Sequence, residues 1–281
     1  MIIIADSGST KTDWIIVDQE KQIAFKTKGV NPLFIKEQDF INELESSFPT
    51  NINSSEVKEV YFYAPACNST ERAAILERPL KSIFTSAKIE VNSDLLAAAR
   101  SLFKHQKGLA CILGTGSNSG YYKDNTLTYK TNSLGYILGD EGSGAHLGLQ
   151  LIKAYLNQQL DKKLEAAFYQ EYKLDLNQII NKIYKEAYPN RFLASFSPFI
   201  KKHIQNEIIY KMVEQSFSDF IDLHILPYQK DEKIAVGFVG SVAFHFRDIL
   251  EKLAKNKAFV ITQISPSPIE NLVQYHLSLS R

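Results

Sequence analysis

The chain has 281 residues, which exceeds the usual size of one domain, so two domains are the default expectation. Hydrophobic residues make up 44% of the sequence and charged residues 22%, a composition that can bury a core and argues against disorder. The 32 Lys and Arg residues nearly balance the 31 Asp and Glu residues. No general attraction to nucleic acid or to an anionic membrane follows from that balance.

The two cysteines, Cys67 and Cys111, are too few for a disulfide framework or for a four-ligand zinc site. The sequence starts on an apolar run, without a basic leader or a cleavage site. No apolar run reaches the ~20 residues that are needed to cross a bilayer. We therefore expect a cytoplasmic protein without nucleic-acid or membrane partners.

The first part of the chain alternates short apolar runs with segments of helical spacing. In chain order, the expected elements are strands at 2–5, 14–17 and 21–27, a helix at 36–48, a strand at 57–63, a helix from residue 70, a strand at 88–91 and a helix from residue 94. Pro79 could kink or end the second of these helices. This part reads as three strands followed by alternating helices and strands.

The order of elements then restarts, although no residue-level repeat accompanies it. We expect strands at 109–113, 118–123 and 127–130, a mostly helical stretch at 143–226, a strand at 234–239, a helix at 242–254, a strand at 258–263 and a helix at 268–279. The boundary is best placed near Lys107-Gly108, which gives domains at 1–108 and 109–281. The last helix could fold back onto the first domain.

A polar turn connects the first two predicted strands. Its residues, Ser7-Gly8-Ser9-Thr10-Lys11-Thr12, supply hydroxyls, an amine and backbone N–H groups, which suit a phosphate. Asp6 at the end of the first strand can hold Mg²⁺ directly or through water. Ordinary hairpin turns also favour Ser, Gly and Asp, so a phosphate site and a plain turn both stay open at this point.

A second glycine-rich turn follows the apolar run at 109–113. Its residues, Gly114-Thr115-Gly116-Ser117-Asn118, again place a small polar turn between a buried strand and a new strand. The turn is not a Walker loop, because no helix follows directly and no Gly-Lys-Ser/Thr ends it. Two such turns at the starts of two similar units favour a nucleotide site more strongly than either turn alone.

Two further glycine-rich segments lie where helices are expected to begin. In the segment 139–144 we expect Asp140 to orient a ligand, whereas Glu141 is most simply a partner of the helix dipole. Either Asp140 or Ser143 could cap that helix. The pair Gly240-Ser241 lets a ligand approach the backbone closely, or simply forms a capped strand-to-helix turn.

The order of these motifs, DSGSTKT, GTGSN, GDEGSG and GFVGSV, resembles the actin-like sugar kinase/Hsp70 superfamily of ATPases. Within it, the chain is similar to the group of N-acetylglucosamine kinases and BadF/BadG/BcrA/BcrD-type ATPases. The resemblance runs in order from residue 1 to about 250, and the helical stretch at 155–230 carries no matching motif. It implies an α/β protein of two RNase H-like domains with ATP between them, a helical insertion in the second domain, Mg²⁺ as the metal, and a homodimer.

The resemblance also assigns roles to individual residues. It places Ser7 to Thr12, Gly114, Thr115 and Gly116 on the phosphates, and Gly240 and Ser241 near the adenosine. It makes Asp94 the base that accepts a proton from a sugar hydroxyl, by analogy the 6-hydroxyl, although a helix N-cap is the simpler interpretation of this residue and both roles are compatible. The sugar would be held by Asn31, Ser117, Asn118 and Asp140.

Three functions stay open from the sequence. The favoured one is an ATP-dependent kinase for N-acetylglucosamine or a related amino sugar such as N-acetylmuramic acid. The second is a BadF-type ATPase that activates a partner reductase or dehydratase through an iron–sulfur cluster shared across a dimer. Two cysteines permit it, but those activators carry a Gly-Gly-Gln-Asp-type loop where this chain has GTGSN. The third is an ATP-gated sensor without turnover, which the combination of Asp6, Lys11 and Asp94 argues against.

Overall fold

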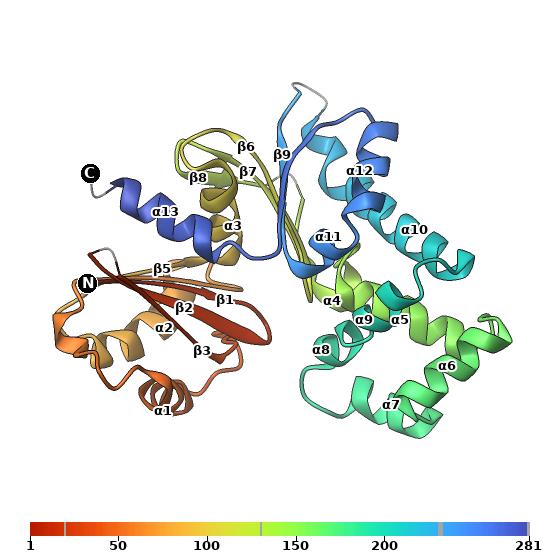
Figure 1. Ribbon diagram of the computed structural model, residues 1–281, viewed down its shortest axis with the longest axis horizontal. Helices are drawn as coiled ribbons and strands as arrows, with labels where there is room; N and C mark the ends of the chain where they lie inside the picture. The colour runs from red at the N-terminus through yellow and green to blue at the C-terminus, as the bar shows by residue number, and fades with distance from the viewer. Residues whose placement is uncertain (20, 130, 230–232, 280–281) are drawn as a thin grey trace. The chain divides into compact units, whose positions relative to one another are not determined.

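A computed structural model of the chain describes residues 1–19, 21–129, 131–229 and 233–279. Its contacts divide the chain into two compact units, Met1–Gln106 with Ser267–Arg281, and Lys107–Pro266. Each unit is built on a five-stranded sheet (Figure 1). Among the described residues, no helix is both long enough and apolar enough to cross a bilayer.

The sheet of the first unit mixes antiparallel and parallel strands. Its order is β3-β2-β1-β4-β5, in which β1, β2 and β3 are antiparallel neighbours, while β4 and β5 run parallel to β1. The elements of this unit are β1 (Ile2–Ser7), β2 (Lys11–Asp18), β3 (Lys21–Lys28), α1 (Glu37–Ser47), η1 (Ser54–Glu56), β4 (Glu59–Ala64), α2 (Thr70–Ile83), β5 (Lys88–Ser93), α3 (Asp94–Phe103) and α13 (Ile269–Leu279).

Helices cover both faces of this sheet, α1 and α2 on one side and α3 and α13 on the other (Figure 1). The strand sequence explains why, because side chains alternate between the faces. Ile3 packs in the cluster with α1 and α2, and its neighbour Ile4 packs in the cluster with α3 and α13. The carboxyl ends of β1, β4 and β5 meet at one edge, so residues that end or follow β1 and β5 come together there.

The second unit repeats this arrangement. Its sheet has the order β10-β9-β6-β7-β8, with β6 antiparallel to β7 and parallel to β9. Its elements are β6 (Gly108–Leu113), β7 (Ser117–Lys123), β8 (Thr126–Thr128), α4 (Gly135–Leu138), α5 (Gly144–Leu156), α6 (Lys162–Tyr172), α7 (Leu176–Tyr184), α8 (Pro189–Ala194), α9 (Ser197–Lys202), α10 (Glu207–His224), η2 (Leu226–Tyr228), β9 (Val236–Val239), α11 (Ser241–His245), α12 (Arg247–Asn256) and β10 (Ile261–Ser265). The predicted α/β class and the duplicated order of elements are confirmed.

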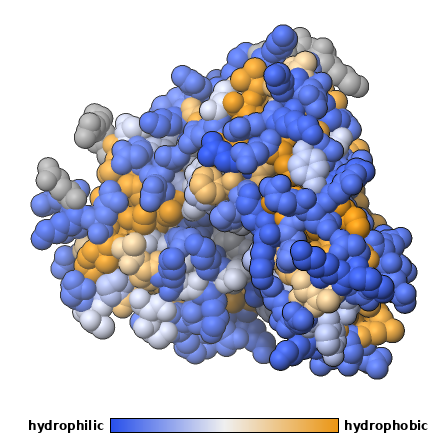
Figure 2. Space-filling model, turned by 45° about the vertical axis from the view of Figure 1, so that its right-hand side comes forward, coloured by the Kyte–Doolittle hydropathy of each residue, from blue (hydrophilic) through white to orange (hydrophobic). Residues whose placement is uncertain are grey.

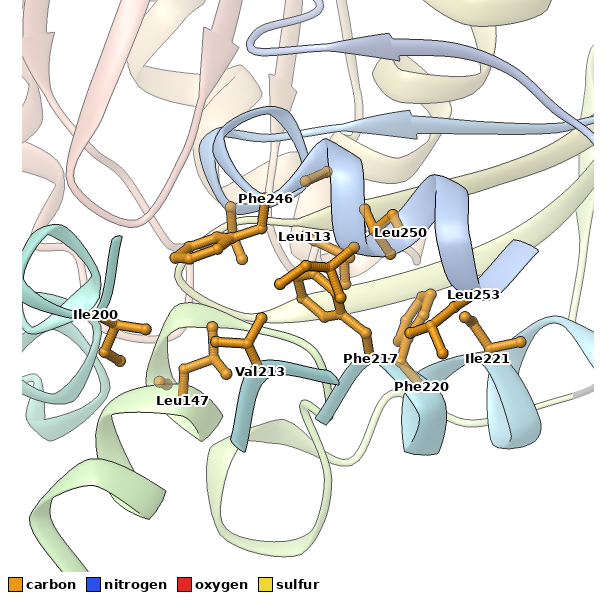
Figure 3. Close-up of a cluster of buried hydrophobic side chains, with 14 of the residues drawn as sticks. Leu113, Leu147, Ile200, Val213, Phe217, Phe220, Ile221, Phe246, Leu250 and Leu253 are labelled. Atoms are coloured by element: carbon orange, nitrogen blue, oxygen red, sulfur yellow. The ribbon is translucent and has the colours of Figure 1, made fainter. Parts of the chain in front are cut away.

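The helical stretch of the second unit is part of its hydrophobic core. Val213 and Phe217 of α10 converge with Leu113 at the end of β6, Leu147 of α5 and Leu250 of α12 (Figure 3). Burying a Leu, Val or Phe side chain of this kind contributes roughly 1.5–3 kcal/mol to stability. Helix α10 is therefore held firmly against the strand that leads into the GTGSN turn.

The surface is mixed in character. Hydrophilic side chains predominate on the face drawn in Figure 2, and apolar side chains gather there in separate patches. The most exposed large apolar side chains include Ile137 and Leu138 of α4, Phe34 and Tyr184. Scattered exposure of this kind is common on folded proteins and does not by itself indicate a partner.

Several boundaries differ from the expectation. The helix expected at 242–254 is two helices, α11 and α12, which are interrupted at Phe246. Pro79 lies inside α2 and does not end it, since the buried Leu76 and Leu80 hold the helix against the sheet. The strand expected at 127–130 is β8, which ends at Thr128; residue 130 lies outside the described residues.

The helix expected at 268–279 is α13, and its contacts group it with the first unit. Its apolar side chains Leu272 and Val273 pack with Ile4 and Ile15 of the first sheet. The sequence alone could not assign this helix to a unit, because its position depends on apolar partners more than 250 residues away. The first unit is therefore made from both ends of the chain.

A buried polar cluster fixes α13 to the first sheet. Nε2 of His276 lies 2.8 Å from the hydroxyl of Tyr63, which also accepts a hydrogen bond from Nη1 of Arg100 at 2.7 Å. Arg100 donates to Glu90 at 2.9 Å, and the ring of Tyr61 stacks on the imidazole with centroids 3.7 Å apart. Burial, together with the nearby Arg100 guanidinium, lowers the pKa of His276 to about 4, so this imidazole is neutral at pH 7.

Acidification should weaken this docking. Between the ordinary pKa of 6.5 and the folded value of about 4, only the unfolded chain takes up the proton on His276, so stability falls as the pH falls. Because of His276, the free energy of unfolding should fall by about 2 kcal/mol when the pH is lowered from 7 to 5. Denaturant titrations of wild type and His276→Gln at both pH values measure the effect. The same pH dependence in both proteins would contradict the account.

Candidate active site

The polar turn Gly8–Thr10 closes the predicted hairpin between β1 and β2. Asp6 lies opposite Asp13 in the antiparallel register, and the Gly8 N–H donates to the Lys11 carbonyl at 2.9 Å. Gly8, Thr10 and Lys11 are exposed, and Ser9 is partly exposed. The turn therefore presents its tip to solvent, where a phosphate can reach its hydroxyls and the Lys11 amine.

Ser7 and Thr12, by contrast, are buried. Oγ1 of Thr12 lies 2.8 Å from Oγ of Ser7, and Ser7 also accepts the N–H of Val30 at 2.9 Å. Both hydroxyls are thus used inside the unit. Their geometry supports a role in shaping the turn, which leaves direct phosphate contact to the exposed residues.

Gly29 is a residue that the sequence reasoning missed. Its N–H donates to the Thr10 carbonyl at 3.0 Å, and a Cβ at this position would lie 2.3 Å from the carbonyl oxygen of Gly8. Only glycine lets the segment after β3 pack so closely on the turn. The next polar residue, Asn31, accepts the N–H of Leu33 through Oδ1 at 3.0 Å.

Asp94 is the first residue of α3, directly after β5. The N-cap of the helix is Ser93, whose Oγ accepts the Leu96 N–H at 3.2 Å. Oδ1 of Asp94 accepts the N–H of Leu95 at 2.8 Å. Because Ser93 caps the helix, the simpler interpretation of Asp94 as the N-cap is wrong, and its carboxylate accepts hydrogen bonds from backbone N–H groups at the start of α3.

The carboxylates of Asp6 and Asp94 lie close enough to influence each other. Burial raises the pKa of Asp94 to about 6. Burial also raises the pKa of Asp6 to about 7, with added repulsion from Asp94 and Asp13 and partial relief from Lys11. A carboxylate that titrates this close to neutrality can take up a proton at physiological pH, as a general base must.

The same pair suits a magnesium ion. Within the described ranges, no group of three His, Cys, Asp or Glu side chains could hold a metal by itself. Mg²⁺ is commonly bound through one or two carboxylates, with water and substrate phosphates as its other ligands. Asp6 with Asp94 beside it fits that donor set, because a cation would relieve the repulsion from Asp94 that adds to the effect of burial on the pKa of Asp6.

The Lys11 amine has a partner already. Its Nζ lies 2.6 Å from Oδ2 of Asp13, and the Nζ of Lys26 lies 3.7 Å from the other oxygen. The Lys11 side chain remains more than half exposed, so this ion pair contributes little to stability. It holds the amine on the same face of the sheet as Asp6.

In the second unit, the GTGSN turn is tied to the start of α5. The carbonyls of Gly114 and Thr115 accept the N–H groups of Gly144 and Ala145 at 2.8 and 3.0 Å. The turn after β9 lies against the same place, since a Cβ on Gly240 would lie 2.2 Å from the Leu113 carbonyl. The structure thus brings three predicted glycine-rich segments of this unit together, and Ser241 is exposed beside them.

Asp140 lies against the same turn. Its Oδ1 accepts the Ser117 N–H at 3.3 Å, and its Oδ2 lies 2.9 Å from where a Cβ on Gly116 would be. Burial raises the pKa of Asp140 to about 6, with further repulsion from Glu141. The Ser117 hydroxyl is buried and has no hydrogen-bond partner among the described residues, so it can both donate to and accept from a polar ligand. Asn118 uses Oδ1 to accept the Ser119 N–H at 2.9 Å.

The neighbours of Asp140 show which residue caps α5 and what Glu141 contacts. Ser143 is the N-cap of α5 and accepts the His146 N–H at 3.1 Å, so Asp140 is not the cap. Oε2 of Glu141 lies 3.5 Å from Nε2 of His224, a buried histidine that belongs to no sequence motif. Glu141 therefore contacts α10 as well as preceding a helix.

Both cysteine side chains are buried, so neither is exposed to bind a metal. Cys67 belongs to the core of the first unit and Cys111 to that of the second. Burial raises the pKa of the Cys67 thiol to about 12 and that of Cys111 well above its usual value. Both thiols therefore stay protonated, whereas metal ligation requires thiolates.

Comparison with known proteins places this site in a family. No protein-family model matches the chain. Over 151 residues the chain is 28% identical to the N-acetylmuramic acid/N-acetylglucosamine kinase of Clostridium acetobutylicum. That match covers 51% of this chain and 49% of the relative, so the chain matches about half the length of this curated relative.

Solved structures extend the similarity to the whole chain. A protein of Porphyromonas gingivalis, provisionally identified as an N-acetylglucosamine kinase, is 40% identical with full coverage of both chains and a TM-score of 0.94. A ROK family glucokinase from Streptomyces griseus, solved with glucose and AMPPNP, shares the fold at 15% identity, 98% and 97% coverage and a TM-score of 0.56. The predicted actin-like ATPase fold is confirmed, and the chain belongs to the N-acetylglucosamine kinase family of actin-like sugar kinases.

Proposed function

We propose that this protein transfers the γ-phosphoryl group of ATP to a hydroxyl of N-acetylglucosamine or of a related amino sugar such as N-acetylmuramic acid, by analogy the 6-hydroxyl. Family membership supports the reaction class. The observation that carries the proposal is Asp94, a partly buried carboxylate at the start of α3 with a pKa raised to about 6.

Asp94 is the general base in this proposal. As the sugar oxygen forms its bond to the γ-phosphorus, the bond from that phosphorus to the β,γ-bridging oxygen breaks and ADP leaves. The hydroxyl proton passes to Asp94. Proton removal of this kind contributes typically 10²–10⁴-fold to a rate, and the rest comes from positioning and charge neutralisation.

Each unit has one glycine-rich turn that suits the phosphates of ATP. In the first unit, the exposed Ser9, Thr10 and Lys11 donate to phosphate oxygens, while Gly29 and the buried hydroxyls keep the turn in shape. The turn 114–116 contributes backbone N–H groups from the second unit. Asp6 would hold Mg²⁺, which when bound neutralises charge on the phosphates.

The sugar is held by groups that can both donate and accept hydrogen bonds. Asp140 accepts from sugar hydroxyls, and the buried Ser117 hydroxyl gains the partner it otherwise lacks. Asn118 and Asn31 each use Oδ1 internally, so they offer their amide N–H groups to the sugar.

Replacing the base should reduce turnover without weakening binding. Asp94→Asn keeps the size of the side chain but cannot accept the proton, so kcat should fall roughly 10²–10⁴-fold with little change in the KM for sugar. Asp18→Asn, at the exposed end of β2, is the matched control and should behave as wild type. A kcat for Asp94→Asn within a few-fold of wild type would remove Asp94 from this role.

Replacing the carboxylate on the magnesium side should act on the metal requirement. Asp6→Asn should raise the Mg²⁺ concentration that gives half-maximal activity, because a carboxylate is a stronger ligand for Mg²⁺ than an amide. The affinity for sugar, measured calorimetrically without nucleotide, should stay near that of wild type. An unchanged Mg²⁺ requirement together with lost sugar binding would reverse the assignment.

The raised pKa values can be measured directly. In ¹³C NMR titrations of aspartate-labelled protein without ligands, Asp6, Asp94 and Asp140 should titrate near 7, 6 and 6. Since Asp6 and Asp94 interact, their two steps belong to the pair. Asp94→Asn removes a negative charge and should therefore lower the pKa of Asp6. Activity should rise with pH through about 6, as the base loses its proton. Ordinary titration near 4 for all three carboxyls would contradict this electrostatic account.

A further inference from the structure

One ridge of α10 faces the loop that carries Asp140. Ser216, Phe220 and His224 are spaced four residues apart, which places them in line along one side of a helix. All three are buried, with 1%, 0% and 8% of their surface exposed. We call these three residues the α10 clamp.

Ser216 holds the backbone of the loop. Its Oγ accepts the Gly142 N–H at 3.0 Å and lies 2.7 Å from Nδ1 of His146. The other ring nitrogen of His146 lies 3.3 Å from Nε2 of Gln150 on the same helix. The hydroxyl therefore links α10 to the loop and, through His146, to the first turns of α5.

Phe220 limits how closely the loop 139–144 can approach α10. Gly142 has φ +74°, and a Cβ there would lie 3.1 Å from Cβ of Phe220 and 3.1 Å from Cδ2 of Leu113. The backbone of the loop thus passes between the α10 ridge and the end of β6. Both the conformation and the space favour glycine at this position.

His224 contacts the other side of the same loop. Its Nε2 lies 3.5 Å from the carboxylate of Glu141, and its Nδ1 lies 3.1 Å from the hydroxyl of Thr131. Burial lowers the pKa of His224, and the Glu141 charge acts in the opposite direction. Its backbone carbonyl also accepts the Ser119 hydroxyl at 3.2 Å, which ties the end of α10 to β7.

Asp140 directly precedes the residues that make these contacts, and its backbone has φ +57°. A non-glycine residue in this left-handed region persists when its surroundings enforce it. The Asp140 carbonyl accepts the Ser143 N–H at 3.0 Å, and the next two residues are those that the clamp holds. The clamp thus contacts the two residues that follow Asp140, whose carboxylate accepts the Ser117 N–H.

Burial of the two polar residues of the clamp, Ser216 and His224, is unfavourable for folding unless other contacts offset it. The rest of the buried side of α10 consists of apolar residues such as Val213, Phe217 and Ile221. A buried serine or histidine in such a surface is unfavourable unless it is hydrogen-bonded. The hydrogen-bonding and charged partners of Ser216 and His224 come largely from the segment 141–146. The polar residues of α10 therefore lie where this segment supplies polar partners.

We propose that the α10 clamp is a positioning device that holds the loop 139–144 so that Asp140 can bind the sugar. This inference rests on the proposed function, since it takes the sugar as the ligand of Asp140. It gives the helical stretch, which carries no recognisable motif, a role in substrate affinity. Ser216, Phe220 and His224 act through Asp140 and do not touch the sugar themselves.

The experiment compares Ser216→Ala with Ser218→Ala, a matched control whose hydroxyl lies 3.5 Å from Asp222 at a partly exposed position of the same helix. The first readout is the KM for sugar against the KM for ATP. Ser216→Ala leaves the Gly142 N–H without its acceptor, so the KM for sugar should rise about tenfold while the KM for ATP stays constant. Ser218→Ala should change neither constant.

The second readout does not depend on activity. Hydrogen exchange of the amides in 139–144, measured without ligands, should be about tenfold faster in Ser216→Ala and unchanged in Ser218→Ala. A wild-type KM for sugar in Ser216→Ala overturns the proposal whatever the exchange shows. An equal rise in both KM values also overturns it. If wild-type protein phosphorylates no amino sugar, the proposed function fails, and unchanged exchange in Ser216→Ala would separately disprove the clamp.

Discussion

The desolvation of two carboxylates at one edge of a sheet is the constraint on which the proposed chemistry depends. Because β1, β4 and β5 are parallel, Asp6 and Asp94 reach the same edge, and partial burial there raises both pKa values. Two such groups are costly to keep ionised together in a folded protein, and a bound cation or a shared proton relieves the cost. The topology of the sheet thereby brings together two carboxyls that titrate near neutrality, the property that the proposed base and the proposed magnesium ligand need.

The two units use one topology but support their glycine-rich turns differently. In the first, short-range contacts suffice: buried hydroxyls on β1 and β2 and the close approach of Gly29 hold the turn. In the second, the turn at 114–118 is supported by carbonyl contacts to α5 and by Asp140, and the Asp140 loop is in turn held by α10. The helical stretch thus does more than enlarge the core, because its longest helix reaches the loop next to the candidate sugar site. An inserted segment can in this way affect substrate binding without contributing a contact residue.

Local patterns allowed much of this to be predicted from the sequence. Alternating apolar runs located the strands, and the turn at 8–10 predicted the first hairpin, since these depend on residues that are close in the chain. What could not be predicted depends on long separations: α13 packing on the first sheet, Gly29 against Gly8, and Ser216 bonded to Gly142 across 74 residues. His224 belongs to no sequence motif, and only the fold shows its contact with Glu141. Ser93 rather than Asp94 capping α3 is a similar case, because the sequence offers both residues at adjacent positions.

The central claim is that this site phosphorylates an amino sugar, and a sugar-dependent ADP-release assay tests it most directly. Purified protein with Mg²⁺ and ATP is given glucose, glucosamine, N-acetylglucosamine or N-acetylmuramic acid, and mass spectrometry identifies the product in each reaction. The account predicts ADP release that depends on an N-acetylated amino sugar, in equimolar amount with a sugar monophosphate. ADP release at the same rate with and without every sugar, with no sugar phosphate formed, would contradict it.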